Sequence, residues 1–245
     1  MAQVTGAKTT LALHHLRTER NPVAVLEYEP RRSRNICIVA GHGYSSSKHN
    51  LDYLCGFLAS QGFRVFSLDF PGHKLGASGG ELRGIDDLID AMSATVDLAL
   101  QRDEPVYLLG HSMGAMTAIF TAAVRPEAQG VVAITTGYGR PSALESLKNA
   151  GVTDFRSGYV EGLALPELVA PTPAYYHRLL PALEGRPQLY IAATRDAMVH
   201  PRSVEELYHH APEPKTFVTI ESDHTNAGEN SRAHVLQWLN VLHPR

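Results

Sequence analysis

Residues 106–119 read VYLLGHSMGAMTAI, a pattern that indicates a strand turning sharply into a helix. Strand-forming apolar residues stop at Gly110, Ser112 stands between two glycines, and a small apolar stretch typical of a helix follows. A tight strand-to-helix turn strains the backbone of its serine and exposes the hydroxyl above the sheet, which only small residues two positions away allow. The pattern therefore predicts a nucleophile at Ser112, with Gly110 and Gly114 making room for the turn.

Short β-rich runs alternate with helical patterns on both sides of this stretch. The first two runs, 9–16 and 22–30, are expected to be antiparallel strands. The later runs are followed by helices expected at 50–61, 84–101, 113–124, 202–210 and 229–242. Strands that alternate with helices indicate βαβ units, and nearly continuous apolar strands indicate a sheet that is covered on both faces. The sequence thus predicts an α/β fold around a mostly parallel sheet.

The stretch from about 140 to 187 interrupts this alternation. It contains six prolines among scattered apolar residues and is too long for an ordinary connection. We predict a short, mostly helical cap insertion within a single domain that spans residues 1–245. The role of its apolar side chains can be interpreted in two ways: they pack the insertion against the sheet, or they cover a pocket over Ser112. These side chains are Phe155, Tyr159, Val160, Leu163, Leu165, Leu168, Tyr175, Tyr176, Leu179 and Leu180.

Composition limits the classes of function. The 245 residues are 44% hydrophobic and 19% charged, as in a globular protein, and the net charge of -3 argues against nucleic-acid binding. No apolar run is long enough to span a membrane, and the N-terminal residues lack the apolar core of a secretory signal. Two cysteines form no disulfide framework. The expected location is cytoplasmic.

A nucleophilic serine needs a base, and the base needs an acid that orients it. In this kind of sheet the expected order along the chain is serine, acid, histidine. Asp196 is the acid at the end of the run 187–196, and His224 lies in the loop after the run 215–223. Because both follow the carboxyl ends of strands, where ligands bind in open parallel sheets, we expect them to meet Ser112 there.

Other candidates for these two roles remain. Asp223 adjoins the base, although a loop-capping role suits it better. His200 is the competing base, but it lies too close to Asp196 in sequence to face the serine easily. The other histidines suggest no metal site, because no pair has ligand spacing together with supporting carboxylates. We therefore predict neither a metal nor a cofactor.

An anion site is expected next to the serine. The strand-like run 35–41 leads into the glycine-rich segment GHGYSSS, residues 41–47. Such a loop can direct a backbone N–H group at an oxygen on which negative charge develops. We predict that the backbone N–H groups of Tyr44 and Met113 form this oxyanion hole.

With these motifs in place, the chain resembles the α/β-hydrolase superfamily, specifically the lipase/esterase-like serine hydrolases. The resemblance covers roughly residues 23–243 and rests on GHGYSSS, DFPGHKLGASGG, GHSMG, RDAMVHP and SDHTNAG. It implies the α/β-hydrolase fold, the roles given above to Ser112, Asp196, His224 and Tyr44, and a structural role for Asp69 and His73. Relatives usually carry glycine where this chain has Lys74.

The resemblance implies hydrolysis of carboxylic esters or thioesters of small to medium apolar acyl groups, through an acyl-enzyme intermediate. The expected partner is a small-molecule substrate. Acyl transfer to an alcohol or amine is the alternative within the same chemistry. A non-catalytic ligand-binding protein is the alternative of another class, but it would have no need for all three of serine, acid and histidine.

Overall fold

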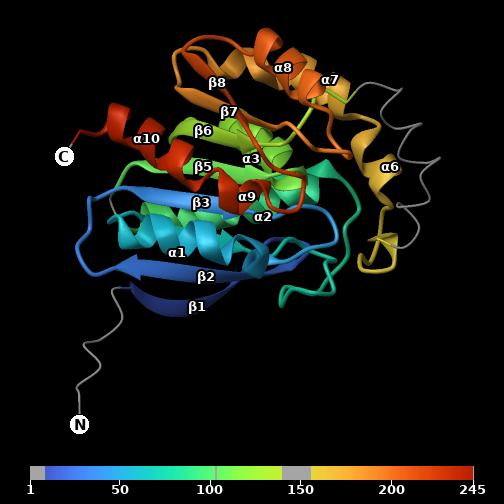
Figure 1. The fold of residues 1–245 in the computed structure, drawn as a ribbon. Coiled ribbons are helices and arrows are strands. Elements are labelled where there is room, and N and C mark those ends of the chain that lie inside the picture. The colour runs from blue at the N-terminus through green and yellow to red at the C-terminus, as the bar shows by residue number, and fades with distance from the viewer. Residues whose placement is uncertain (1–8, 103, 140–155, 245) are drawn as a thin grey trace.

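The computed structural model describes residues 9–102, 104–139 and 156–244, and an eight-stranded sheet runs through its centre (Figure 1). The strand order is β1-β2-β4-β3-β5-β6-β7-β8. The strands are β1 (Thr9–Arg17), β2 (Pro22–Pro30), β3 (Cys37–Gly41), β4 (Arg64–Leu68), β5 (Val106–His111), β6 (Ala128–Ile134), β7 (Gln188–Ala193) and β8 (Lys215–Ile220).

Strand pairing confirms the predicted mostly parallel sheet. β1 pairs with β2, and β2 with β4, in antiparallel fashion, while all pairs from β4 and β3 through to β8 are parallel. The carboxyl ends of β3, β5, β7 and β8 consequently open onto the same edge of the sheet. The loops that carry the predicted site residues all leave from this edge.

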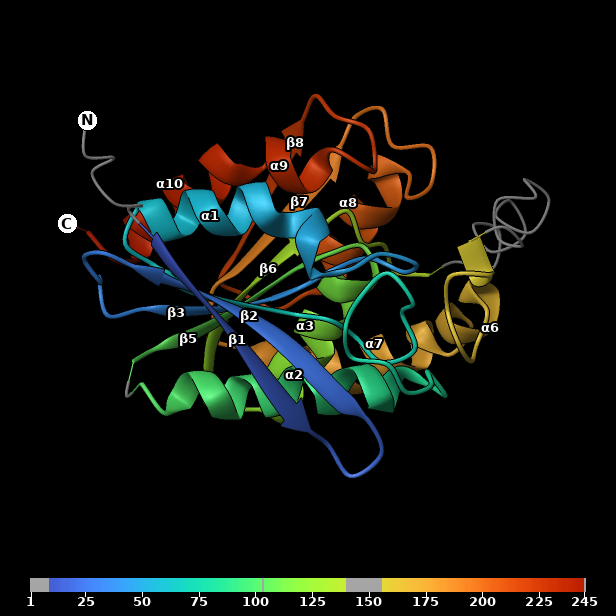
Figure 2. The same cartoon turned by 90° about the horizontal axis from the view of Figure 1, so that it is seen from below.

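Helices cover both faces of the sheet, as predicted (Figure 2). The main helices are α1 (Asp52–Ser60), α2 (Ile85–Leu100), α3 (Met113–Val124), α8 (Pro201–His210), α9 (Ala227–Asn230) and α10 (Arg232–Leu242). One face packs on α2, α3 and α8, and the other packs on α1, α9 and α10. Cys37 and Cys55 are buried, free thiols on opposite faces.

β5 illustrates how the sequence produces these two cores. Val106 and Leu108 belong to the core beneath α2 and α3, whereas Tyr107 and Leu109 belong to the core beneath α1 and α10. Successive side chains of a strand point to opposite faces, so a strand that is covered on both sides must be apolar at every position. All six residues of β5 are buried.

Two predicted helices differ in detail. The helix expected at 50–61 opens with a 3-10 turn, η1 (Lys48–Leu51), and continues as α1. The helix expected at 229–242 is instead two helices, α9 and α10, separated at Ser231. The buried Ser231 hydroxyl donates to the carbonyl oxygen of Gly228 at 2.8 Å. Such side-chain bonds compete with the regular helical pattern, and apolar periodicity does not reveal them.

The structure describes residues 156–187 of the predicted insertion, whereas residues 140–155 lie outside the described part. This segment contains α6 (Leu165–Val169), α7 (Thr172–Leu179) and the 3-10 turn η2 (Leu180–Leu183). Backbone bonds attach it to the loop after β4: Glu161 donates to Gly72 at 2.7 Å, and Leu163 donates to Leu82 at 2.8 Å. The described part of the insertion is therefore fixed against the body of the protein.

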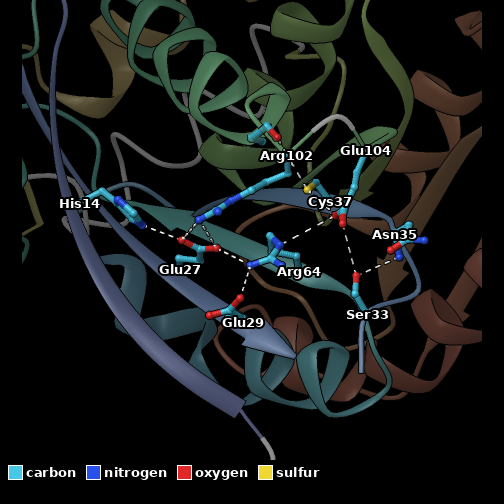
Figure 3. A network of polar contacts seen from close by, with 10 residues as sticks. His14, Glu27, Glu29, Ser33, Asn35, Cys37, Arg64, Arg102 and Glu104 are labelled. Carbon is cyan, nitrogen blue, oxygen red and sulfur yellow. Dashed lines mark hydrogen bonds and ion pairs between the residues drawn. The ribbon is translucent and has the colours of Figure 1, made fainter. Parts of the chain in front are cut away.

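A polar network around Glu27 of β2 joins β1, β2 and β4 to Arg102, which follows α2 (Figure 3). The Glu27 carboxylate is 2% exposed and accepts hydrogen bonds from His14 at 2.7 Å, Arg64 at 2.7 Å and Arg102 at 2.9 Å. Burial alone would raise the pKa of Glu27, but the hydrogen bonds from Arg64 and His14 outweigh it and lower the pKa below the usual 4.5. This carboxylate is therefore charged in the folded protein at neutral pH.

Replacing Glu27→Ala should lower the free energy of unfolding by about 3–5 kcal/mol, because it leaves Arg64 buried without its main partner. Urea unfolding followed by circular dichroism measures this change. The control is Glu29→Ala, which removes a half-exposed partner of Arg64 and should cost less than about 1 kcal/mol.

The lowered pKa of Glu27 also determines how the folding stability changes with pH. The charged Glu27 carboxylate stabilises the fold fully above pH 4.5, the usual pKa of a glutamate in the unfolded chain. This stabilisation is lost as the pH falls through the lower pKa that Glu27 has in the folded state. The destabilisation by Glu27→Ala should accordingly shrink in strong acid. If Glu27→Ala and Glu29→Ala lowered the free energy of unfolding equally at neutral pH, this would contradict the importance of the buried carboxylate.

Candidate active site

Ser112 occupies the turn between β5 and α3, as predicted. Its backbone has φ 56° and ψ −118°, and it is one of four non-glycine residues with positive φ in the described part of the chain. The Ser112 N–H donates to the carbonyl oxygen of Ile134 at 2.8 Å, which ties the turn to β6. A strained serine held by neighbouring strands is typical of a site where geometry is maintained for function.

Gly110 and Gly114 are required by close backbone approach. A Cβ atom at Gly110 would lie 2.1 Å from the carbonyl carbon of Gly114, and a Cβ at Gly114 would lie 2.1 Å from the carbonyl oxygen of Gly41. Because these contacts are with backbone, no side-chain adjustment could relieve them. The two glycines therefore allow α3 to start directly beneath β3 and Ser112 to turn away from the sheet.

The structure joins the predicted acid to the predicted base. Asp196 follows β7 and is 5% exposed, and its Oδ2 lies 2.6 Å from Nδ1 of His224. Its other oxygen, Oδ1, accepts from the backbone N–H groups of Met198 and Val199, each at 2.8 Å. Three hydrogen bonds thus hold the carboxylate and fix the orientation of the imidazole ring.

Ser112 and His224 line the same small pocket, whose volume is about 60 Å³. Its described lining residues are Gly43, Tyr44, Ser46, Asn50, His111, Ser112, Arg156, Leu165, Met198, His224 and Thr225. They come from the loops after β3, β5, β7 and β8 and from the insertion. The edge of the sheet therefore brings together the three residues that the sequence places 84 and 28 positions apart.

The competing candidates lie outside this arrangement. Asp223 is exposed, and its carboxylate accepts from the backbone and side-chain N–H groups of Asn226 at 2.9 and 3.0 Å. These bonds lower the pKa of Asp223 and make it a loop cap. His200 is exposed at the start of α8, where its Nδ1 accepts from the N–H of Arg202.

The backbone N–H groups of Tyr44 and Met113, the predicted oxyanion-hole donors, lie in the loop after β3 and at the start of α3. Neither has a hydrogen-bond acceptor among the residues that the structure describes. Met113 begins α3, and the first N–H groups of a helix have no partner within it. The Tyr44 side chain is anchored separately, because its hydroxyl donates to the carbonyl oxygen of Leu163 at 3.0 Å.

His111, which precedes the serine, contacts the base in a way that sequence reasoning missed. Its Nε2–H donates to the carbonyl oxygen of His224 at 2.8 Å, so the serine turn holds the histidine loop directly. Burial, together with the charge of a protonated His224, lowers the pKa of His111 to about 3. His111 is therefore a neutral hydrogen-bond donor, a role that its sequence neighbours do not reveal.

A buried ion pair supports the loop that carries Tyr44. Lys48 is 4% exposed, and its Nζ lies 2.5 Å from Oδ2 of Asp69, while its N–H donates to Oδ1 at 2.7 Å. Asp69 also accepts from the N–H of Ala77 at 2.8 Å, consistent with the loop-fixing role implied by the resemblance. The sequence around Lys48 does not indicate that this residue is buried in an ion pair, because lysine side chains are usually exposed.

Most described apolar residues of the insertion pack against the core. Val160, Leu168, Tyr176 and Leu180 are at most 5% exposed and belong to the core beneath α3, whereas Leu165 also lines the pocket. Phe155 lies outside the described residues. Lys74 does not line the pocket; its exposed ammonium pairs with Glu161 at 3.2 Å. The packing interpretation therefore accounts for most of the apolar residues in the described part of the insertion.

The described residues contain no membrane-spanning helix and no cluster of metal ligands. No helix among these residues is both long enough and apolar enough to cross a membrane. In the same residues, no three His, Cys, Asp or Glu side chains lie where they could share a metal ion.

Comparison with known proteins identifies relatives that act on esters. The chain is 32% identical over 148 residues to human monoglyceride lipase, covering 58% of this chain and 46% of the lipase. It is 28% identical over 156 residues to a pimeloyl-[acyl-carrier protein] methyl ester esterase of Neisseria meningitidis, covering 64% of this chain and 53% of the esterase. The chain thus spans about half the length of these curated relatives.

The fold has close counterparts among solved structures. An esterase of Pyrococcus furiosus superimposes with a TM-score of 0.74 at 19% identity, over 95% of this chain and 93% of the esterase. A sequence model of the family described as serine aminopeptidase, S33, matches residues 32–170. Since this match includes more than half of the 245 residues, the chain belongs to the S33 serine aminopeptidase family of α/β-hydrolases.

Proposed function

We propose that the chain hydrolyses carboxylic esters or thioesters with Ser112 as nucleophile. The observation that carries this proposal is the strained Ser112 turn in one pocket with His224, whose Nδ1 is bound to Asp196. The esterase and lipase relatives support an ester substrate. Peptide and other amide bonds are a second substrate class, which the name of the family suggests.

Each residue has a defined role in this reaction. Because Nδ1 of His224 is bound to Asp196, Nε2 is the nitrogen that takes the Ser112 proton as Oγ attacks the acyl carbon. Asp196 holds this tautomer and stabilises the imidazolium that forms. His224 then protonates the leaving alcohol or thiol and later activates the water that releases the acyl group.

The oxyanion of each tetrahedral intermediate binds the backbone N–H groups of Tyr44 and Met113. Preorganised donors act on charge that exists only in the transition state, and one such donor is worth about 3–4 kcal/mol. The Lys48–Asp69 pair is 2.5 Å across and buried, so it holds the Tyr44 loop in place without contacting the substrate. No cofactor takes part in these steps.

The proposed acyl specificity is for small to medium apolar groups. Leu165 and Met198 provide apolar surface at the pocket, and each methylene buried against them would contribute up to about 0.8 kcal/mol. We expect kcat/KM to rise from acetyl to medium-chain acyl groups and then to fall for long chains, since the pocket volume is only about 60 Å³.

A chain-length series of nitrophenyl esters and acyl thioesters tests this expectation, with Ser112→Ala measured in parallel. Product analysis in water and with added alcohol separates hydrolysis from acyl transfer, and nitroanilides test amide cleavage. A flat or steadily falling profile would show that Leu165 and Met198 do not select the acyl group.

A further inference from the structure

Arg156 contributes a cation to the pocket that the proposed reaction does not use. It is a lining residue beside Ser112 and His224, and no carboxylate lines the pocket in the part of the chain that the structure describes. Arg156 is only partly exposed, so water screens its charge less than that of a surface arginine. The described lining of the pocket therefore carries one positive charge, beside the nucleophile.

The contacts of Arg156 leave most of its donors available in the described structure. Its Nη1 donates to the hydroxyl of Ser45 at 3.4 Å, which is a long bond to a neutral group. A guanidinium has five N–H donors in a planar fork that matches the two oxygens of a carboxylate. A single weak contact with a hydroxyl makes little use of this capacity.

The backbone next to Arg156 is held in place. The N–H of Tyr159 donates to the carbonyl oxygen of Arg156 at 3.1 Å, and the N–H of Lys74 donates to that of Tyr159 at 2.9 Å. The guanidinium is thus carried by a turn that is bonded to the loop after β4. A cation on a fixed turn can position a ligand rather than only attract it.

We propose that the preferred ester carries a carboxylate, which Arg156 binds while the ester carbonyl lies at Ser112. This inference rests on the proposed ester hydrolysis and specifies its substrate class. One guanidinium balances the single charge of a carboxylate, whereas a doubly charged phosphate would need a further cation, and the described lining offers no other lysine or arginine. Arg156 acts here as a specificity-determining residue.

Two matched pairs of esters test the proposal. The first pair varies the acyl side: the 4-nitrophenyl half-ester of adipic acid and its neutral terminal amide. The second pair varies the alcohol side: 4-carboxyphenyl butyrate and 4-carbamoylphenyl butyrate. Each pair is measured with the wild-type chain, Arg156→Gln, Arg156→Lys and the control Arg178→Gln. Arg178 is an exposed arginine of the same insertion that does not line the pocket.

The expected result is a preference for the anionic member of at least one pair, and the responsive pair shows which side of the ester Arg156 contacts. Arg156→Gln should reduce the anionic-to-neutral ratio of kcat/KM by about ten- to a hundredfold, as expected for a lost hydrogen bond between charged groups. Arg156→Lys should restore part of the ratio, and Arg178→Gln should keep the wild-type ratio. Added salt should lower the ratio.

A ratio near one in both pairs would overturn the proposal. An equal loss for both members in Arg156→Gln would also overturn it, because that would make Arg156 only a structural contact to Ser45. Calorimetric binding of the anionic ester to Ser112→Ala, with and without Arg156→Gln, measures recognition independently of turnover. Arg156-dependent binding without turnover in the wild type would reject the proposed hydrolysis and keep the carboxylate site.

Discussion

Ser112→Ala is expected to reduce ester turnover by about 10⁵- to 10⁶-fold, the loss seen when a serine hydrolase loses its nucleophile. The substitution removes one oxygen from a half-buried side chain, and alanine fits the space that serine fills. The thermal unfolding temperature should therefore remain close to that of the wild type. Steady-state kinetics with a nitrophenyl ester and a thermal melt measure the two quantities.

Labelling by a fluorophosphonate provides the control for Ser112→Ala. The probe should react with the wild-type chain and with Ser45→Ala but not with Ser112→Ala. His224→Ala should cause a loss similar to that of Ser112→Ala, because the two groups act as a unit, whereas His200→Ala alters only the start of α8. Substantial turnover by Ser112→Ala, or labelling of another serine, would contradict the assignment.

Asp196→Asn is expected to reduce kcat by about 10⁴-fold without unfolding the protein. An amide in place of the carboxylate can donate to Nδ1 of His224, which is 2.6 Å from Oδ2, and this favours the tautomer that cannot accept the serine proton. The amide oxygen can still accept from Met198 and Val199, so the loop after β7 keeps its shape. Rapid-quench or steady-state kinetics measure the loss.

The matched control is Asp223→Asn, one residue before the base. This carboxylate is exposed and bonded to Asn226, so its replacement should cost less than about tenfold in kcat. A nearly normal Asp196→Asn variant together with an inactive Asp223→Asn variant would reverse the assignment of the acid.

The features that sequence predicted well are those set by neighbouring residues. The alternation of β5 between two cores, the glycines around Ser112 and the placement of Asp196 and His224 after strands all follow from local patterns and from the geometry of a parallel sheet. The polar pairs that support these features join distant segments. Lys48 meets Asp69 only through packing of two loops, and no local pattern marks that pairing.

Arg156 and His111 illustrate the same limit within the pocket. The contribution of Arg156 depends on where an irregular, proline-rich insertion folds back, and no periodicity fixes that position. His111 has a role because a carbonyl oxygen from a loop 113 positions later lies within 2.8 Å of its ring. Side-chain roles that depend on tertiary packing can be recognised only in the structure.

The position of the Glu27 network has a consequence for how such a chain can change during evolution. Glu27 lies on β2 opposite Phe66 of β4, and Arg64 begins β4 (Figure 3). Ser112 follows β5, which lies three strand spacings from β2 in the sheet, with β4 and β3 between them. At about 4.8 Å per spacing the two strands are roughly 14 Å apart, beyond the range over which substitutions usually interact. Selection for heat tolerance can therefore act on the Glu27 network while selection for new substrates acts on the pocket.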